Sequence, residues 1–166
     1  YLQVAGGLSR ATALLVSLIA LIFAAAICPL AGWYSDRVGR RVTVMTACGL
    51  LMGVVYPSFL MASSGSFAAS IIGVMLLAVG AVLCGVVTAA LLSETFPTRT
   101  RYTASAITYN MAYTIFGGTA PLVATWLIST TGSNLSPAFY LIAVALLALA
   151  GGLALPETSR ISLHDA

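Results

Sequence analysis

Residues that could form ion pairs or directed hydrogen bonds gather in two short charged segments of this chain. The first begins at Gly32 and ends at Arg41, with the order Gly-Trp-Tyr-Ser-Asp-Arg-Val-Gly-Arg-Arg. Asp36 can accept from backbone amides at a helix start or from an arginine, and Arg40 can pair with an acid or anchor at lipid headgroups. Gly39 and Gly32 permit a positive φ or a close approach of the backbone. This chemistry suits a tight turn controlled by charge.

The second segment runs from Ser93 to Tyr102 and joins two apolar stretches. Its Pro97 disfavours helix at Phe96, so a helix should stop there. Glu94 is then at the end of one helix and Arg101 at the start of the next. We expect both charges to reach the segment around Asp36.

Two interpretations of these segments stay open. As charges alone, they are typical of loops that hold positive charge at one membrane face. The ordered pattern G-x-x-S-D-R-x-G-R-R is much less expected by chance than a loop with the same charges in any order. It favours a specific network of ion pairs.

Other kinds of site find little support in the sequence. We find no paired carboxylates, no Ser/His/Asp constellation, no metal-ligand spacing and no phosphate-binding glycine loop, so the sequence predicts no enzyme and no cofactor. Each of Cys28, Cys48 and Cys84 lies in an apolar run, and we interpret them as packing residues. His164 stands alone in a polar tail. The net charge of +3 comes with no lysine and indicates topology, not nucleic-acid binding.

The elements that position the charged segments are membrane helices. The chain is 60% hydrophobic and 7% charged, where soluble domains carry about a quarter charged residues. Two uncharged runs, Val42 to Ser93 and Tyr102 to Pro156, are each long enough for two spans and a turn, and Ala11 to Tyr34 adds another. The sequence therefore predicts an all-α bundle of five transmembrane helices, at about 11–33, 42–62, 69–92, 102–129 and 137–155.

The arginines predict how these helices are oriented. Six of the seven lie on one side, in the two charged segments and at Arg160 in the tail. By the positive-inside rule this side is cytoplasmic, and so is the carboxy terminus.

The first charged segment resembles the signature G-x-x-x-D-R-x-G-R-R/K of the major facilitator superfamily, which Asp36, Gly39, Arg40 and Arg41 match. The second resembles the E-x-F-P-T-x-x-R segment of sugar-porter-like members and metabolite:proton symporters. Three further features resemble the last two helices of those symporters: Tyr109-Asn110, Phe116 to Pro121 with Trp126 to Ile128, and Leu155-Pro156-Glu157-Thr158.

The resemblance implies that residues 1–166 form part of the carboxy-terminal six-helix bundle of a twelve-helix carrier, with helices equivalent to the eighth through twelfth. It implies proton-coupled symport of an organic acid or osmolyte by alternating access in a bacterial inner membrane. The partners it implies are the lipid bilayer, a small-molecule substrate, protons and an amino-terminal helical half. The expected cytoplasmic charge latch consists of Asp36, Arg37, Gly39, Arg40, Arg41, Glu94 and Arg101.

Several residues of the predicted 102–129 helix could serve transport or only packing. Tyr109, Asn110 and Tyr113 place polar groups inside the membrane, where they could line the pathway or bridge to a neighbouring helix. Gly117, Gly118 and Pro121 could form a hinge or permit tight packing.

The start of the chain predicts that it is incomplete. Residues 1–10 look like the outer end of a helix whose beginning is missing, and five helices are an odd number for such a carrier. The alternative is a non-transporting remnant or an accessory membrane subunit that packs against partner helices.

Overall fold

The computed structural model describes residues 1–3 and 5–154, and within these it confirms an all-α membrane protein. Some predicted features lie outside the described residues. They are the segment Leu155-Pro156-Glu157-Thr158 that carries a family resemblance, the residues Arg160 and His164, and the last residue of the predicted fifth span. Five helical stretches are long and apolar enough to cross a membrane. The helices are α1 (Arg10–Val38), α2 (Arg40–Ala62), α3 (Phe67–Thr95), α4 (Arg101–Ala112), α5 (Gly118–Thr131) and α6 (Ser136–Ala154), with a π-helical turn, η1 (Tyr113–Gly117), between α4 and α5.

Local chemistry explains where these helices begin and end. The Ser9 hydroxyl accepts from the Thr12 amide at 3.2 Å and caps the start of α1. α3 ends at Thr95 because Pro97 forces Phe96 into an extended conformation, as the sequence predicts. Gly132, with a φ of 67°, ends α5 through a bond from its amide to the Ile128 carbonyl at 2.9 Å.

The first helix is longer than predicted, and the first charged segment is not a loop. α1 continues through Asp36 and Arg37 to Val38, and α2 starts at Arg40, so Gly39 alone separates them. Charged residues end a membrane span but can continue a helix. The end of the helix was therefore predicted too early, at the end of the apolar run. Gly39 turns the chain with φ 95° and ψ 162°, a conformation that is essentially restricted to glycine.

The beginning of the chain also differs from expectation. Residues 1–3 and 5–9 form turns and irregular structure instead of the end of a helix, with the Ala5 amide bound to the Tyr1 carbonyl at 2.8 Å. Gly7 has a φ of 63°, which interrupts helix before Ser9. The Tyr1 hydroxyl donates to the Asn134 carbonyl at 2.7 Å, and burial raises the pKa of this hydroxyl.

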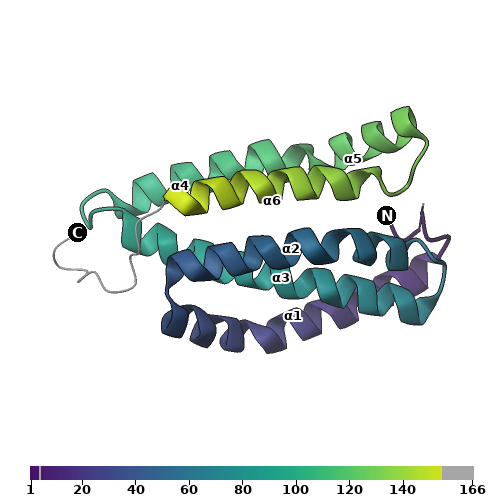
Figure 1. The fold of residues 1–166 in the computed structure, drawn as a ribbon, viewed down its shortest axis with the longest axis horizontal. Coiled ribbons are helices and arrows are strands. Elements are labelled where there is room, and N and C mark those ends of the chain that lie inside the picture. The colour runs from purple at the N-terminus through teal and green to yellow at the C-terminus, as the bar shows by residue number, and fades with distance from the viewer. Residues whose placement is uncertain (4, 155–166) are drawn as a thin grey trace.

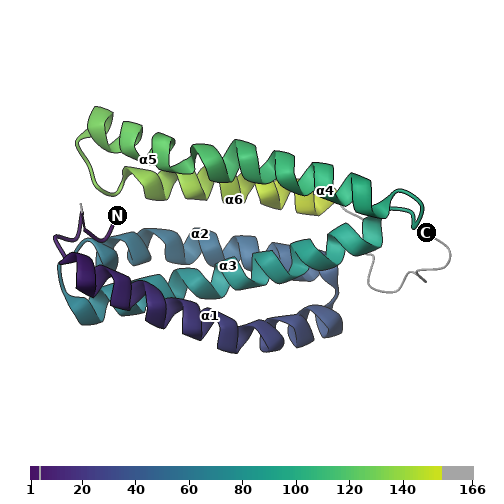
Figure 2. The same ribbon diagram turned by 180° about the vertical axis from the view of Figure 1, so that it is seen from behind.

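The helices form two groups, visible in Figure 1 and from behind in Figure 2. α3 packs against both α1 and α2, while α6 packs against α2 and α5. The α1–α2 turn and the α3–α4 connection lie at one end of the bundle, and the α2–α3 and α5–α6 turns lie at the other (Figure 1). The two charged segments, far apart in sequence, thus meet at one end.

Small residues allow the close contacts between helices. A Cβ on Gly73 would lie 2.7 Å from the Ser58 carbonyl oxygen, and one on Gly80 would lie 2.6 Å from the Leu51 side chain, so α2 and α3 approach closely at both points. At the other face of α2, a Cβ on Gly152 of α6 would lie 2.6 Å from Val44. By contrast, no residue of α4, η1 or α5 is buried among the described residues.

Candidate functional site

The ends of three helices bring a charge cluster together at the end of the bundle that holds the charged segments. Asp36 lies in the last turn of α1, Arg40 is the first residue of α2, and Glu94 lies in the last turn of α3. The turn at Gly39 places Arg40 one helical turn from Asp36, and Pro97 ends α3 just after Glu94. Each residue therefore owes its position to an element boundary.

Arg40 is the centre of this cluster. Its Nη1 lies 2.6 Å from Asp36 Oδ1, and its Nη2 lies 2.8 Å from Glu94 Oε1. The Arg40 Nε also donates to both Glu94 oxygens, at 3.0 and 3.2 Å, and Nη1 donates to Ser35 Oγ at 3.1 Å. One guanidinium thus links α1, α2 and α3.

The two ion pairs differ in exposure. The side chains of Arg40 and Glu94 are 13% and 15% exposed, whereas that of Asp36 is 70% exposed. A solvent-exposed pair contributes about 0–1 kcal/mol, while a desolvated, bidentate pair is stronger and costly to break. The Arg40–Glu94 pair therefore contributes most to the stability of the cluster, and the Asp36–Arg40 contact is the one that can be broken at low cost.

The remaining predicted latch residues lie around this cluster. Arg41 Nη2 donates to the Leu153 carbonyl at 2.9 Å and ties α2 to α6. The Arg37 guanidinium lies 4.3 Å from the centre of the Trp33 ring, a cation–π contact within α1. Arg101 instead binds its own turn: its Nε donates to the Phe96 carbonyl at 3.1 Å. In this structure the cluster joins Asp36, Arg40 and Glu94, and Arg101 holds the α3–α4 connection.

Ser35 and the Leu153 carbonyl were not among the predicted site residues. Ser35 is 1% exposed and accepts from Arg40. Its place directly before Asp36 in the pattern was a usable signal. A backbone carbonyl such as that of Leu153 leaves no signal in sequence.

The predicted pathway and hinge residues lie along α4, η1 and α5. The rings of Tyr109 and Tyr113 stack with centroids 4.3 Å apart. The Asn110 side chain donates to the Ala106 carbonyl at 2.7 Å, within its own helix. A single π-helical turn ends at Gly117, directly before Gly118. Among the described residues, a Cβ on Gly118 would meet nothing within 4 Å, so the glycine pair here accompanies the π turn and not a close helix contact.

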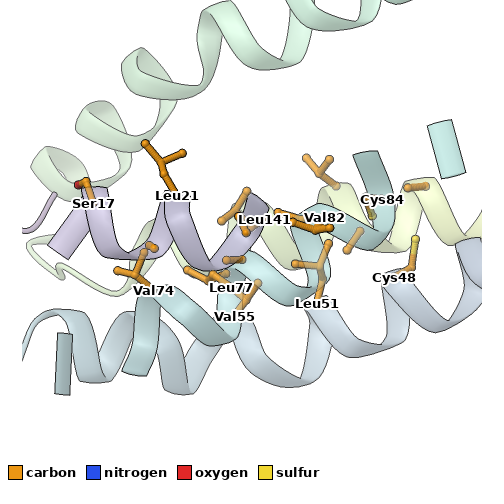
Figure 3. Close-up of a pocket in the computed structure, with 17 residues that line it drawn as sticks. Ser17, Leu21, Cys48, Leu51, Val55, Val74, Leu77, Val82, Cys84 and Leu141 are labelled. Carbon is orange, nitrogen blue, oxygen red and sulfur yellow. The ribbon is translucent and has the colours of Figure 1, made fainter. Parts of the chain in front are cut away.

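A cavity of about 770 Å³ lies between α1, α2, α3 and α6 (Figure 3). Leu51, Leu77, Leu141 and similar side chains line it, and Cys48 and Cys84 lie beside one another at one end. The lining carries no charged side chain. A zwitterionic solute would lose its hydration here without compensation, so the cavity is unsuited to one.

Within the part of the chain that the structure describes, no three His, Cys, Asp or Glu residues gather as metal ligands do. Cys48 is buried and Cys28 is exposed on α1. The role of the cysteines as packing residues stays a prediction.

Comparisons with known proteins extend this description. Residues 1–163 match the family model described as Major Facilitator Superfamily. The chain is 32% identical to the ectoine/proline transporter ProP of Corynebacterium glutamicum over 160 residues, which are 96% of this chain and 32% of that protein. It is 33% identical over 138 residues to the proline/betaine transporter of Escherichia coli strain K12, covering 83% of this chain and 27% of the relative.

The glycine betaine/proline/ectoine/pipecolic acid transporter OusA of Dickeya dadantii is 34% identical over the same length, with the same coverage. The chain thus spans about a third of the length of the curated relatives it matches, or less. No solved structure matches it.

Proposed function

This chain belongs to the major facilitator superfamily, and on that premise we propose that it is the carboxy-terminal part of a carrier that moves small zwitterionic osmolytes across a bacterial inner membrane. The substrates in the names of its relatives, among them proline, betaine and ectoine, support this solute class. The five membrane helices carry the chain through the bilayer more than once. No enzyme activity forms part of this proposal.

The observation that carries the proposal is the Asp36–Arg40–Glu94 cluster. It connects the ends of three membrane helices at one membrane face, which we propose is cytoplasmic. In alternating access, two helical bundles rock about a central site that opens to one side at a time. A network that is closed in one state and separated in the other biases that equilibrium, because only an energy difference between states shifts populations.

Asp36 is the member of the cluster that we expect to respond to the conformational change. Its side chain is 70% exposed and bound to Arg40, so a second charged group can compete for the same guanidinium without dismantling the Arg40–Glu94 pair. In this proposal the Glu94–Arg40 pair stays formed in both states of the latch, and the Asp36–Arg40 contact forms in one state and is replaced in the other. Arg37 contacts Trp33 within α1, Arg41 ties α2 to α6, and Arg101 holds the α3–α4 connection.

The proposed coupling ion is the proton, and its carrier group lies outside the described helices. The charged residues of the five spans lie at helix ends: Arg10, Asp36 and Arg37 on α1, Arg40 and Arg41 on α2, Glu94 on α3 and Arg101 on α4. Proton coupling in membrane carriers uses an ionisable group within the membrane. We therefore place that group in helices that the relatives have beyond the matched third.

Uptake by the complete carrier that contains this segment tests the proposal. In cells without other osmolyte carriers, we expect saturable uptake of radiolabelled glycine betaine or proline that a protonophore abolishes. Uptake that survives the protonophore contradicts proton coupling. A complete protein that reaches the membrane and moves neither solute contradicts transport of these osmolytes and favours the accessory-subunit alternative.

The latch makes a separate prediction for Asp36→Asn. The variant should lower the maximal uptake rate several-fold and change KM less, because the exchanged contact biases conformations and does not touch the solute. Arg10→Gln, at the far end of α1, is the control for removing a charge remote from the cluster, although of opposite sign. Unchanged uptake by Asp36→Asn would overturn the latch.

A further inference from the structure

The helix formed by α4, η1 and α5 has two different faces. Ala104, Ile107 and Met111 follow one another at intervals of three and four residues and make one side apolar. Tyr109 and Tyr113 lie on the opposite side, since residues two apart on a helix point about 200° from one another. Phenol groups within the membrane favour a protein or solute neighbour over lipid, so the tyrosine side faces away from the acyl chains.

The two tyrosine rings form a pre-arranged pair. Their centroids lie 4.3 Å apart and their planes make an angle of 30°. Tyr109 is 41% and Tyr113 61% exposed, so the pair leaves ring surface uncovered. Because the rings already stack on one helix, a solute that binds them does not have to order them first.

The depth of the pair excludes a lipid headgroup as its ligand. Tyr109 lies eight residues beyond Arg101, about 12 Å along the helix axis. Arg101 marks the end of the span, and the hydrocarbon core is about 30 Å thick. A charged group that reaches these rings therefore belongs to a solute or to the protein and not to a lipid headgroup.

The ring faces favour one chemical group over others. An aromatic face carries negative electrostatic potential and attracts a cation, with methylated ammonium groups as the best-matched ligands. A quaternary ammonium has no N–H to donate, so it needs no hydrogen-bond acceptor, and the described part of the Arg101–Thr131 span has no carboxylate to offer one. The secondary ammonium of proline does donate hydrogen bonds and gains less from rings alone.

From these observations we infer that Tyr109 and Tyr113 form an aromatic subsite that binds the quaternary ammonium group of a betaine-type zwitterion during transport. The inference rests on the proposed function and deepens it by assigning the cationic end of the solute to α4. The carboxylate end binds elsewhere in the complete carrier.

The test compares glycine betaine with proline in uptake by the complete carrier. Tyr113→Leu removes a ring face, and we expect it to raise KM for glycine betaine about 2- to 30-fold, the range that a cation–π contact supplies. KM for proline should rise less. Tyr113→Phe keeps the ring and should retain most of the affinity. Trp126→Leu, an aromatic replacement on α5 outside the pair, is the matched control and should leave both KM values unchanged.

Several outcomes would overturn the subsite while leaving transport intact. One is a Tyr113→Leu carrier whose KM is unchanged, or rises equally for both solutes. Another is a Tyr113→Phe carrier as impaired as Tyr113→Leu, which would assign the effect to the hydroxyl. Failure of the wild-type carrier to take up either solute would instead contradict the proposed function.

A second measurement covers the case in which the leucine variants do not reach the membrane. 3,3-Dimethylbutanoate has the shape of glycine betaine with carbon in place of the charged nitrogen. We expect it to compete with glycine betaine uptake by the wild-type carrier at least tenfold more weakly than unlabelled glycine betaine. Equal competition would show that the positive charge is not recognised and would overturn the subsite.

Discussion

Arg40 holds two carboxylates of very different exposure, and under the proposed latch this difference separates stability from transport at the level of single residues. Glu94 is shielded from water together with Arg40, while Asp36 is mostly solvated. If the Asp36 charge is removed, water can solvate the side of Arg40 that it contacted. Water has little access to the Arg40–Glu94 pair, so the loss of that contact is not compensated. We therefore expect substitutions of Glu94 and Asp36 to have distinct effects.

Glu94→Gln should lower stability more than Asp36→Asn. We expect Glu94→Gln to destabilise the complete carrier by about 1–3 kcal/mol, the range for hydrogen bonds to charged groups, and Asp36→Asn by about 1 kcal/mol or less. The apparent Tm of the detergent-solubilised protein measures both. Equal shifts would contradict the division of the cluster into a structural pair and an exchangeable contact.

The members of this cluster were predictable from sequence, but their geometry was not. Charge type and order in the two charged segments selected Asp36, Arg40 and Glu94. Nothing in the sequence distinguishes Arg101, which binds the Phe96 carbonyl, from an arginine in the cluster. In the structure, the short α3–α4 connection places the Phe96 carbonyl 3.1 Å from Arg101 Nε.

Among the helices, α3 depends most on small residues. Gly73 and Gly80 lie on the side of α3 that faces α2, where an added methyl group would meet the Ser58 carbonyl or Leu51. Gly85, on the same helix, has open space around it. In a membrane, where water does not drive helices together, such close packing is a main source of association.

Gly73→Ala and Gly85→Ala should therefore have opposite effects. We expect Gly73→Ala to cost about 1–3 kcal/mol, because the new Cβ contacts backbone that cannot rotate away. Gly85→Ala should be neutral or stabilising by up to about 1 kcal/mol, since alanine is the better helix former. Thermal unfolding of the complete carrier compares them, and a loss of stability confined to Gly85→Ala would contradict the packing described here.

Helix number and type followed from composition, whereas boundaries followed from single residues. The break at residues 63–66 and the stop before Pro97 are confirmed, because serine, glycine and proline act locally. The break predicted at 130–134 lies at 132–135, because α5 continues through Thr131 and is capped by Gly132. The extension of α1 to Val38 and the π turn at Tyr113–Gly117 were not predicted. The extension depends on charged residues that continue a helix beyond the membrane, and the π turn depends on a glycine pair inside a helix. Composition alone predicts neither.

At the scale of the whole molecule, charge is distributed unevenly between the two ends. The end with the α1–α2 turn and the α3–α4 connection carries Arg37, Arg40, Arg41, Arg99 and Arg101. The α2–α3 and α5–α6 turns at the opposite end are uncharged. The positive-inside rule therefore orients the entire bundle and not just one helix.

Labelling with a membrane-impermeant maleimide in intact cells tests this orientation. In a carrier without other reactive cysteines, Ser64→Cys and Ser133→Cys should be labelled, because both positions are exposed in the turns that we place outside. Thr98→Cys is equally exposed in the α3–α4 connection and should be labelled only after the membrane is opened. The reverse pattern would invert the topology.

The single glycine between α1 and α2 also affects how the protein is made. With Gly39 as the only residue between the two helices, the chain reverses direction at that face without a loop. We therefore expect α1 and α2 to enter the bilayer together, as one helical hairpin. An epitope tag inserted after Val38 should separate Asp36 from Arg40 and reduce the amount of folded carrier in the membrane, whereas the same tag after Ser64, in an exposed turn, should be tolerated.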